Sequence, residues 1–211
     1  DLAIADIGCG NGAAARVLAS DLDARVTAVD FLPDFLAELN AAAEAEGLSD
    51  RITTLEASMD VLPFADEQFD VFWSEGAIYN MGFRAGVEAW RRFLKPGAVL
   101  AVSDLTWLTH ERPAELQAHW DAVYPEVDEA SAKMAVLEQG GFAPIGYFAL
   151  PQRCWLENYY RPMQARFEAF PERHGHSDAA TSIVDAEKHE IDLYERFRAF
   201  VSYGFYMARR I

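Results

Sequence analysis

Apolar residues alternate between short strand-like and longer helix-like patterns along most of the chain. Between the strand-like segments they recur at helical spacing, as at Phe83, Val87 and Trp90, and the Lys95-Pro96-Gly97 triplet is expected to end that run. This alternation predicts an α/β fold with a parallel sheet covered by helices on both faces. Seven segments rich in β-branched or aromatic residues are predicted as strands, at residues 2–7, 25–30, 52–57, 69–73, 98–103, 142–150 and 201–209.

The last two predicted strands are separated by some fifty residues without strand character. Two amphipathic helical patterns, at 163–170 and 191–200, flank a polar break at 174–177. We expect one domain over residues 1–211, with residues 151–199 forming a helical cap inserted between the sixth and seventh strands.

Composition and charge narrow the cellular compartment and the classes of binding partner that we expect for this protein. The 211 residues are 51% hydrophobic and 25% charged, and no run approaches the roughly 18 apolar residues of a membrane span, so no membrane association is expected. The formal net charge of −16 repels phosphate backbones and argues against a nucleic-acid partner. The two cysteines, Cys9 and Cys154, form no disulfide framework, which favours the cytoplasm. Exposed aromatic residues in the insertion are compatible with a homodimer.

Three glycines at alternate positions, Gly8, Gly10 and Gly12, follow the first strand directly. Residues without a Cβ let the backbone turn sharply and let a ligand lie against bare N–H groups. A helix is expected to begin near Ala13, and its N-terminus favours a carboxylate or phosphate. Because Gly8, Gly10, Ala13 and Asp30 also satisfy the dinucleotide pattern, the loop alone leaves an NAD(P)-dependent oxidoreductase open.

Four segments together favour a different ligand: DIGCGNG at 6–12, the acidic Asp30, LPFADEQFDV at 62–71 and FLKPGAVLAVSD at 93–104. With them the chain resembles class I S-adenosylmethionine-dependent methyltransferases. The 62–71 segment is similar to the ubiquinone-biosynthesis and small-molecule branch, and WSEGAIYNMGF at 73–83 to a bacterial subgroup of such enzymes. The resemblance implies a Rossmann-like, doubly wound sheet of seven strands in the order 3-2-1-4-5-7-6, with strand 7 antiparallel. It also implies in-line methyl transfer from S-adenosylmethionine to a small-molecule acceptor.

The resemblance assigns the methionine half of the cofactor to the first and fourth strands. The backbone at Gly8, Cys9 and Gly10 would pack on it, while Asp6 would order the loop or meet the amino group. Ser74, at the end of the fourth strand, would offer its carbonyl to that amino group.

The ribose and adenine would lie beyond the second and third strands. Asp30 would accept hydrogen bonds from both ribose hydroxyls, and Phe31 would lie on the adenine. The adenine rim falls at Ser58, Met59 and Asp60. Many relatives carry aspartate where this chain has Ser58. Because that carboxylate is missing here, the expected acceptor for the exocyclic amine is Asp60 or a backbone oxygen.

Glu75, Tyr79 and His110 are the candidates for a general base, which is needed only if the acceptor arrives protonated. Glu75 beside a sulfonium would also bind a cationic substrate. Each has a structural alternative: Glu75 bonded to backbone, Tyr79 packed in the core, and His110 exposed on a loop.

Connections that leave the carboxyl ends of parallel strands start at the ligand edge of the sheet, so the cap is expected to contribute to substrate binding. Trp155, Tyr159 and Tyr160 follow the sixth strand immediately and are candidates for the substrate wall, with the core of the cap as the alternative.

No metal site is expected, because His174, His176 and His189 form no closed ligand set with Cys154. Cys9 is interpreted as a small residue beneath the cofactor, since no basic partner lies near it in sequence. Besides the oxidoreductase, a binding module that keeps the cofactor without turnover remains an alternative.

Overall fold

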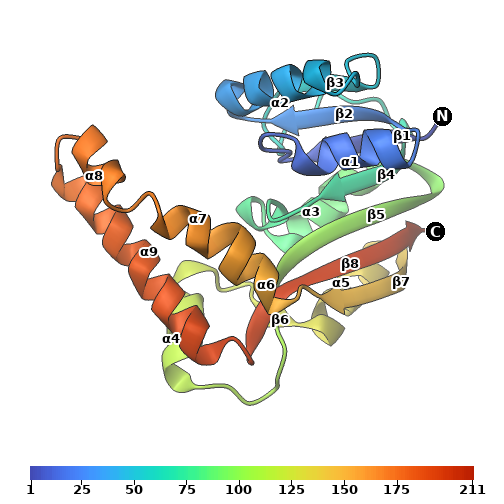
Figure 1. Cartoon of the computed structure of the whole chain (residues 1–211). Helices are drawn as coiled ribbons and strands as arrows, with labels where there is room; N and C mark the ends of the chain where they lie inside the picture. The colour runs from blue at the N-terminus through green and yellow to red at the C-terminus, as the bar shows by residue number, and fades with distance from the viewer. The chain divides into compact units, whose positions relative to one another are not determined.

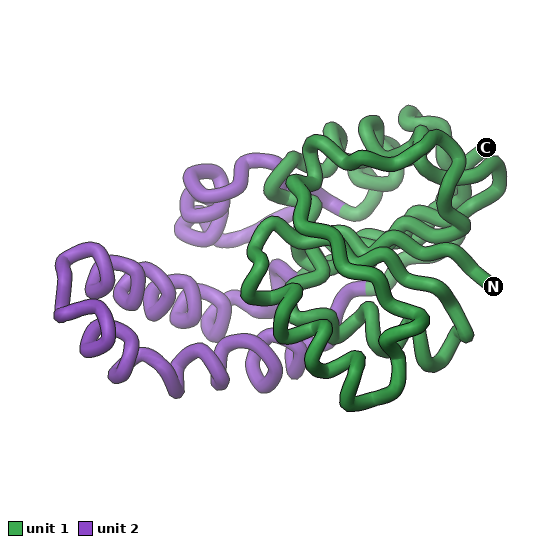
Figure 2. The backbone as a smooth tube through the Cα atoms, turned by 90° about the horizontal axis from the view of Figure 1, so that it is seen from above, with its two compact units in different colours: residues 1–105, 130–148, 203–211 green, residues 106–129, 149–202 purple.

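The computed structural model describes all residues, 1–211, and the chain forms two compact units. Unit 1 comprises residues 1–105, 130–148 and 203–211, and unit 2 comprises residues 106–129 and 149–202 (Figure 2). No helix combines the length and apolarity needed to cross a bilayer.

Unit 1 is built on a sheet in the order β3-β2-β1-β4-β5-β8-β7 (Figure 1). Its seven strands are the seven that the sequence predicts, and their order confirms 3-2-1-4-5-7-6. A further two-residue strand, β6 (Asp128–Glu129), pairs with the end of β5 within unit 2. It is too short for any periodicity to reveal it. The strands of this sheet are β1 (Ala3–Ile7), β2 (Arg25–Asp30), β3 (Ile52–Glu56), β4 (Phe69–Ser74), β5 (Leu94–Trp107), β7 (Phe142–Ala149) and β8 (Val201–Arg210).

Strands β1 to β5 pair in parallel, whereas β8 runs in the opposite direction. The Arg210 guanidinium, at the end of β8, donates to the carbonyl of Leu94, which begins β5. At the other end, the Leu108 N–H donates to the Phe200 carbonyl at 2.8 Å. The expected antiparallel last strand is therefore confirmed.

The helices of unit 1 cover both faces of this sheet. In β1, Ile4 packs in one cluster with α1 and α2, while Ala5 and Ile7 belong to a second cluster with α3 and α5. This change of face follows from the two-residue period of a strand. The helices are α1 (Ala13–Asp21), α2 (Pro33–Ala45), α3 (Phe83–Trp90) and α5 (Ala130–Gln139), with 3-10 turns at Ile78–Asn80 and Arg91–Phe93.

The helical run ends before residues 95–97, with α3 stopping at Trp90 and a 3-10 turn at Arg91–Phe93. The triplet does not close the helix, however, because it lies inside β5. Phe69 of β4 is paired with Leu94, and Val71 with Val99, so the intervening residues of β5 bulge out of the ladder and pairing resumes after them. Proline and glycine thus mark an irregularity within a strand here.

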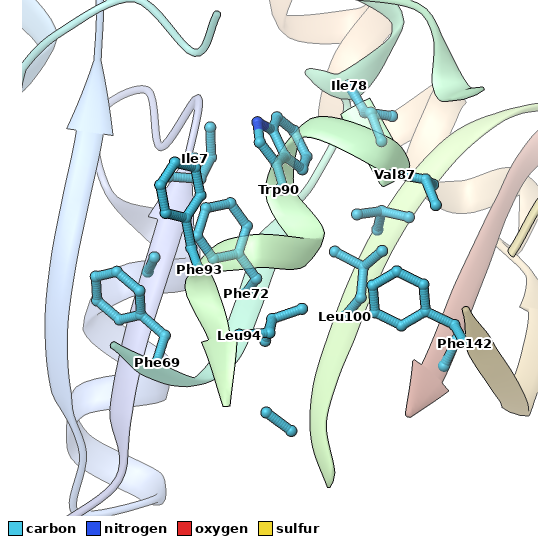
Figure 3. Close-up of a cluster of buried hydrophobic side chains, with 14 of the residues drawn as sticks. Ile7, Phe69, Phe72, Ile78, Val87, Trp90, Phe93, Leu94, Leu100 and Phe142 are labelled. Carbon is cyan, nitrogen blue, oxygen red and sulfur yellow. The ribbon is translucent and has the colours of Figure 1, made fainter. Parts of the chain in front are cut away.

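Aromatic rings fill the larger cluster of unit 1. Phe72 of β4 is fully buried, stacks on Phe93 at 6.0 Å between centroids, and lies 5.4 Å from Trp90 (Figure 3). The Trp90 indole N–H donates to the Met59 carbonyl at 3.2 Å, so this packing also fixes the segment after β3.

Unit 2 contains the helical segment expected between the last two strands. The expected polar break at 174–177 is the turn before α9, and Ser177 caps that helix by accepting the N–H of Ala180. Its helices are α4 (Ala114–Val123), α6 (Gln152–Trp155), α7 (Arg161–Gln164), α8 (Ala169–Arg173) and α9 (Asp178–Phe197), with a π-helical turn at Leu156–Tyr160.

Phe72→Ala should lower the free energy of unfolding by about 3–5 kcal/mol, because it removes a buried ring and leaves a cavity. Phe31→Ala is the matched control, since Phe31 is 71% exposed and its loss should cost less than about 0.5 kcal/mol. Chemical denaturation of both variants measures the difference. Equal losses would contradict the placement of Phe72 in the core.

Candidate active site

The glycine loop is anchored to the second strand. The N–H groups of Gly8 and Cys9 both donate to the Val29 carbonyl, each at 2.9 Å. Gly8 has φ +69°, and a Cβ there would lie 2.4 Å from the Cβ of Ala77. Only glycine therefore lets the loop pass this close to the segment that follows β4.

The glycine motif suggests that Gly12 makes room for the ligand, but in the structure Gly12 makes room for a side chain of α2. It precedes α1 with φ +79°, and a Cβ there would lie 2.1 Å from Leu39 Cδ1. The structure therefore places Gly12 against α2, where it permits close helix packing.

Asp30, at the end of β2, is held in place by two backbone donors. Its Oδ2 accepts the Gly10 N–H at 2.8 Å, and its Oδ1 accepts the Leu32 N–H at 2.9 Å. Each carboxylate oxygen retains acceptor capacity beyond these bonds. The neighbouring Phe31 ring is exposed to solvent.

Asp6 lies within β1 and is only 1% exposed. Its Oδ2 has no hydrogen-bond partner within the protein. Burial, and then the negative charges of Glu75 and Asp30, raise the pKa of Asp6 to about 7, while the backbone N–H of Ala15 acts in the opposite direction. Asp6 is thus a buried acid with one oxygen to which the protein donates no hydrogen bond.

The end of β4 brings further polar groups to the same edge. The Ser74 hydroxyl donates to the Ile7 carbonyl at 2.9 Å and ties β4 to β1. Glu75 follows at the surface, where desolvation by the surrounding protein raises its pKa and the indole of Trp73 opposes the shift. Tyr79 lies on the 3-10 turn and is 41% exposed.

The segment after β3 reaches the glycine loop through Met59. Its Cε lies 3.5 Å from the position that a Cβ on Gly8 would occupy. Ser58 and Asp60 flank Met59, and the Ser58 hydroxyl donates a hydrogen bond to Asp60 Oδ2 at 3.0 Å. The expected adenine rim is therefore a closed turn with Met59 against the loop.

The remaining predicted residues belong to unit 2. His110 is exposed, and its Nδ1 lies 2.8 Å from Glu129 Oε1. Trp155 and Tyr160 are buried within the helical unit, whereas Tyr159 is half exposed. The Trp155 ring stacks on Tyr194 with centroids 4.8 Å apart. This packing agrees with the alternative that Trp155 belongs to the core of the helical segment.

Cys9 fits its interpretation as a small residue, because burial raises the pKa of its thiol and keeps it from being a nucleophile. No group of three histidine, cysteine, aspartate or glutamate side chains is arranged to hold a metal ion.

The sequence analysis missed Ala77 and Val29. Ala77 limits the space at Gly8, and the Val29 carbonyl anchors the loop. The only signal for either was its position at or just after a strand end, since neither residue type carries chemistry.

Comparison with known proteins identifies the family of this chain. A family described as a methyltransferase domain matches residues 4–97. The 27-O-demethylrifamycin SV methyltransferase of Amycolatopsis mediterranei (strain S699) is 30% identical over 206 residues, which cover 92% of this chain and 70% of that enzyme. The chain belongs to the class I S-adenosylmethionine-dependent methyltransferases.

Other methyltransferases match in part. The glycine/sarcosine/dimethylglycine N-methyltransferase of Actinopolyspora halophila is 37% identical over 99 residues, and the match covers 46% of this chain but only 18% of that enzyme. Among solved structures, an S-adenosylmethionine-dependent methyltransferase from Geobacter sulfurreducens in complex with S-adenosyl-L-homocysteine superposes with a TM-score of 0.85 at 18% identity, covering 100% of this chain and 85% of that one. YjhP from E. coli gives 0.86 at 20% identity, covering 100% and 86%. These structures share the methyltransferase fold.

The residues present fit S-adenosylmethionine, the cofactor of this methyltransferase family. Gly8 leaves backbone bare where a side chain would fill the space, and Asp6 offers a buried acceptor oxygen without a partner. The carboxylates of Asp6, Asp30 and Glu75 also complement the positive charge of an amino or sulfonium group.

Asp6→Asn should stabilise the methyltransferase progressively as the pH rises from about 4 to 7. In the folded state the pKa of Asp6 is raised to about 7, so the wild type binds more protons folded than unfolded over this range and loses stability with increasing pH. The loss is on the order of 1.4 kcal/mol per pH unit. The free energies of unfolding of both proteins, measured by denaturation between pH 4 and 8, test this.

The control is Asp50→Asn, which changes an exposed aspartate of unit 1. It shows the effect of the same substitution at an exposed position of unit 1. A constant difference between Asp6→Asn and the wild type would mean that Asp6 titrates normally.

Proposed function

We propose that this chain transfers the methyl group of S-adenosylmethionine to a small-molecule acceptor. The observation that carries the proposal is the glycine loop held against Val29, with the carboxylates of Asp6 and Asp30 beside it. The names of several relatives support a small acceptor, among them a rifamycin, a glycine/sarcosine/dimethylglycine and a tocopherol methyltransferase.

The methionine half of the cofactor is proposed to lie on the backbone of Gly8, Cys9 and Gly10. The unpartnered Oδ2 of Asp6 and the carbonyl of Ser74 are the proposed acceptors for its amino group. Support comes from the Ser74 hydroxyl bond to Ile7, which fixes the end of β4 next to the loop.

For the ribose and adenine, Asp30 is the proposed acceptor of both hydroxyls, and its bonds to Gly10 and Leu32 hold it in the required orientation. Phe31 is proposed to cover one face of the adenine. Its exposed ring is free to take that place. The rim is assigned to Ser58, Met59 and Asp60.

When bound, the cofactor supplies a methyl group already activated for in-line displacement. The protein then contributes mainly by holding the acceptor in a near-attack geometry, an effect that can reach roughly 7–11 kcal/mol. Glu75, Tyr79 and His110 remain the proposed residues for proton removal from a protonated acceptor. Glu75 and Tyr79 are the two of these that unit 1 presents near its strand ends.

Trp155, Tyr159 and Tyr160 remain the proposed substrate wall of unit 2. Trp155 and Tyr160 are buried by other residues of unit 2, so their rings are not exposed for direct contact with the acceptor. Tyr159 is therefore the member to which we assign direct contact, and the other two support it through ring packing.

Isothermal titration with S-adenosylmethionine and with NAD(H) tests the proposal against the oxidoreductase. We expect micromolar binding of S-adenosylmethionine and none of NAD(H), and the reverse would overturn the assignment. Labelled cofactor offered with a metabolite panel tests turnover. Persistent absence of transfer despite binding would favour a binding module.

Asp30→Ala should weaken S-adenosylmethionine binding by at least about 1.5 kcal/mol, because a charge-assisted pair of hydrogen bonds is lost. Asp50→Ala, at an exposed position of the same unit, should leave the affinity unchanged. Titration calorimetry on folded samples of both variants provides the measurement. Wild-type affinity in Asp30→Ala would remove Asp30 from the site.

A further inference from the structure

One face of the sheet carries a continuous row of side chains from β2 to β8. Asp6 of β1 is paired with Ala28 of β2 on one side and with Trp73 of β4 on the other. Trp73 is paired in turn with Ala101 of β5. The Phe205 ring of β8 continues the row, because its centroid lies 5.0 Å from that of Trp73. A ring from β8 thus lies across the small side chain of β5 and reaches β4.

The next row, at the carboxyl edge of the parallel strands, contains the proposed site residues. Side chains on one face of a strand recur every second residue. Because β8 is antiparallel, its member of this row stands two positions before Phe205. From β2 to β8 the row therefore consists of Asp30, Gly8, Glu75, Ser103 and Tyr203. Tyr203 is thus the residue that β8 contributes to the row in which the cofactor and the acceptor are proposed to meet.

The contacts within this row place the Tyr203 hydroxyl beside the turn that follows β4. The Gly76 N–H donates to the Ser103 hydroxyl at 2.8 Å, which ties the turn to β5. Apart from its two neighbours in the chain, the only atom within 4 Å of the position of a Cβ on Gly76 is the Tyr203 hydroxyl oxygen, at 4.0 Å. Strands β4 and β8 flank β5 and lie roughly 10 Å apart. The Tyr203 side chain therefore lies across β5 with its hydroxyl toward β4.

The two residues after Glu75 differ in the space around them. At Ala77 the turn closes on the glycine loop, since the Cβ of Ala77 lies 2.4 Å from the position of a Cβ on Gly8. Gly76 is exposed and leaves open space, whose nearest boundary is the hydroxyl of the half-buried Tyr203. An acceptor that lies beside Glu75 in this space meets the Tyr203 hydroxyl.

We propose that the Tyr203 hydroxyl contacts the methyl acceptor and orients its nucleophilic atom through a hydrogen bond. The inference rests on the proposed function and adds a residue to its acceptor side. A phenol hydroxyl both donates and accepts a hydrogen bond, so it suits an acceptor whose nucleophile is nitrogen or oxygen. Tyr203 keeps its own proton throughout and contributes by orientation, while Glu75 remains the proposed residue for proton removal.

The test uses two analogues of S-adenosylmethionine and needs no identified acceptor. Both carry nitrogen in place of sulfur, and they differ only in the chain that replaces the transferred methyl group. One carries a 2-aminoethyl chain, whose amine takes the place of an acceptor nitrogen, and the other an n-propyl chain of the same shape. Titration calorimetry of the intact chain near neutral pH gives the ratio of the propyl Kd to the aminoethyl Kd.

We expect the wild type to prefer the aminoethyl analogue. Tyr203→Phe should lower that preference about tenfold or more, because a hydrogen bond to a charged group is lost. This variant keeps the ring, and its Kd for S-adenosyl-L-homocysteine, which has no group at this place, should equal that of the wild type. Tyr147→Phe is the matched control, since Tyr147 of β7 packs beside Tyr206 in the cluster on the other face of the sheet. Its ratio should follow the wild type.

An unchanged ratio in Tyr203→Phe would overturn the proposal, as would a wild type that binds both analogues equally. Equal weakening of all three ligands in Tyr203→Phe would assign Tyr203 a purely structural role and would also overturn it. In each of these cases, binding of S-adenosyl-L-homocysteine by the wild type leaves the proposed function intact. Failure of the wild type to bind any of the three ligands would instead overturn the proposed function, and this inference with it.

Discussion

One backbone carbonyl, that of Val29, organises the functional edge of the sheet by accepting the N–H groups of Gly8 and Cys9. This shared acceptor turns the chain as it leaves β1. The turn carries the Gly10 N–H to Asp30, which anchors the next loop through Leu32. The conformation depends on the absence of a side chain at Gly8, because Ala77 occupies the adjacent space. Removal of this contact would release both loops at once.

The same edge shows how a binding site and a stable fold make opposing demands. Hydrophobic packing around Phe72 and Trp90 gives unit 1 its rigidity. Asp6 works against that rigidity, because a buried acid between two other carboxyl groups destabilises the empty protein at neutral pH. A cationic ligand beside Asp6 would offset this contribution. The site thus lowers the stability of the ligand-free protein, which is a common property of residues arranged for a ligand rather than for the fold.

Much of the architecture could be predicted from the sequence, because strand segments and helical stripes have clear periods. The order of the strands came from the resemblance of whole segments. What could not be predicted depends on contacts between distant residues. The bulge at 95–97 follows from pairing with β4, and the position of Gly12 follows from the side chain of Leu39. Among the proposed site residues, Asp6 and Asp30 are marked in the sequence by their places beside the glycine loop and at a strand end, whereas the burial of Trp155 depends on its packing against α9.

The position of β8 has a consequence for how the protein is made. Although β8 follows the other strands in sequence, it lies between β5 and β7 and not at the rim. During synthesis the facing edges of β5 and β7 therefore stay unpaired until β8, which follows the helical segment, has emerged from the ribosome. Open strand edges are templates for pairing with other chains. The nascent protein is accordingly most exposed to aggregation just before its sheet closes.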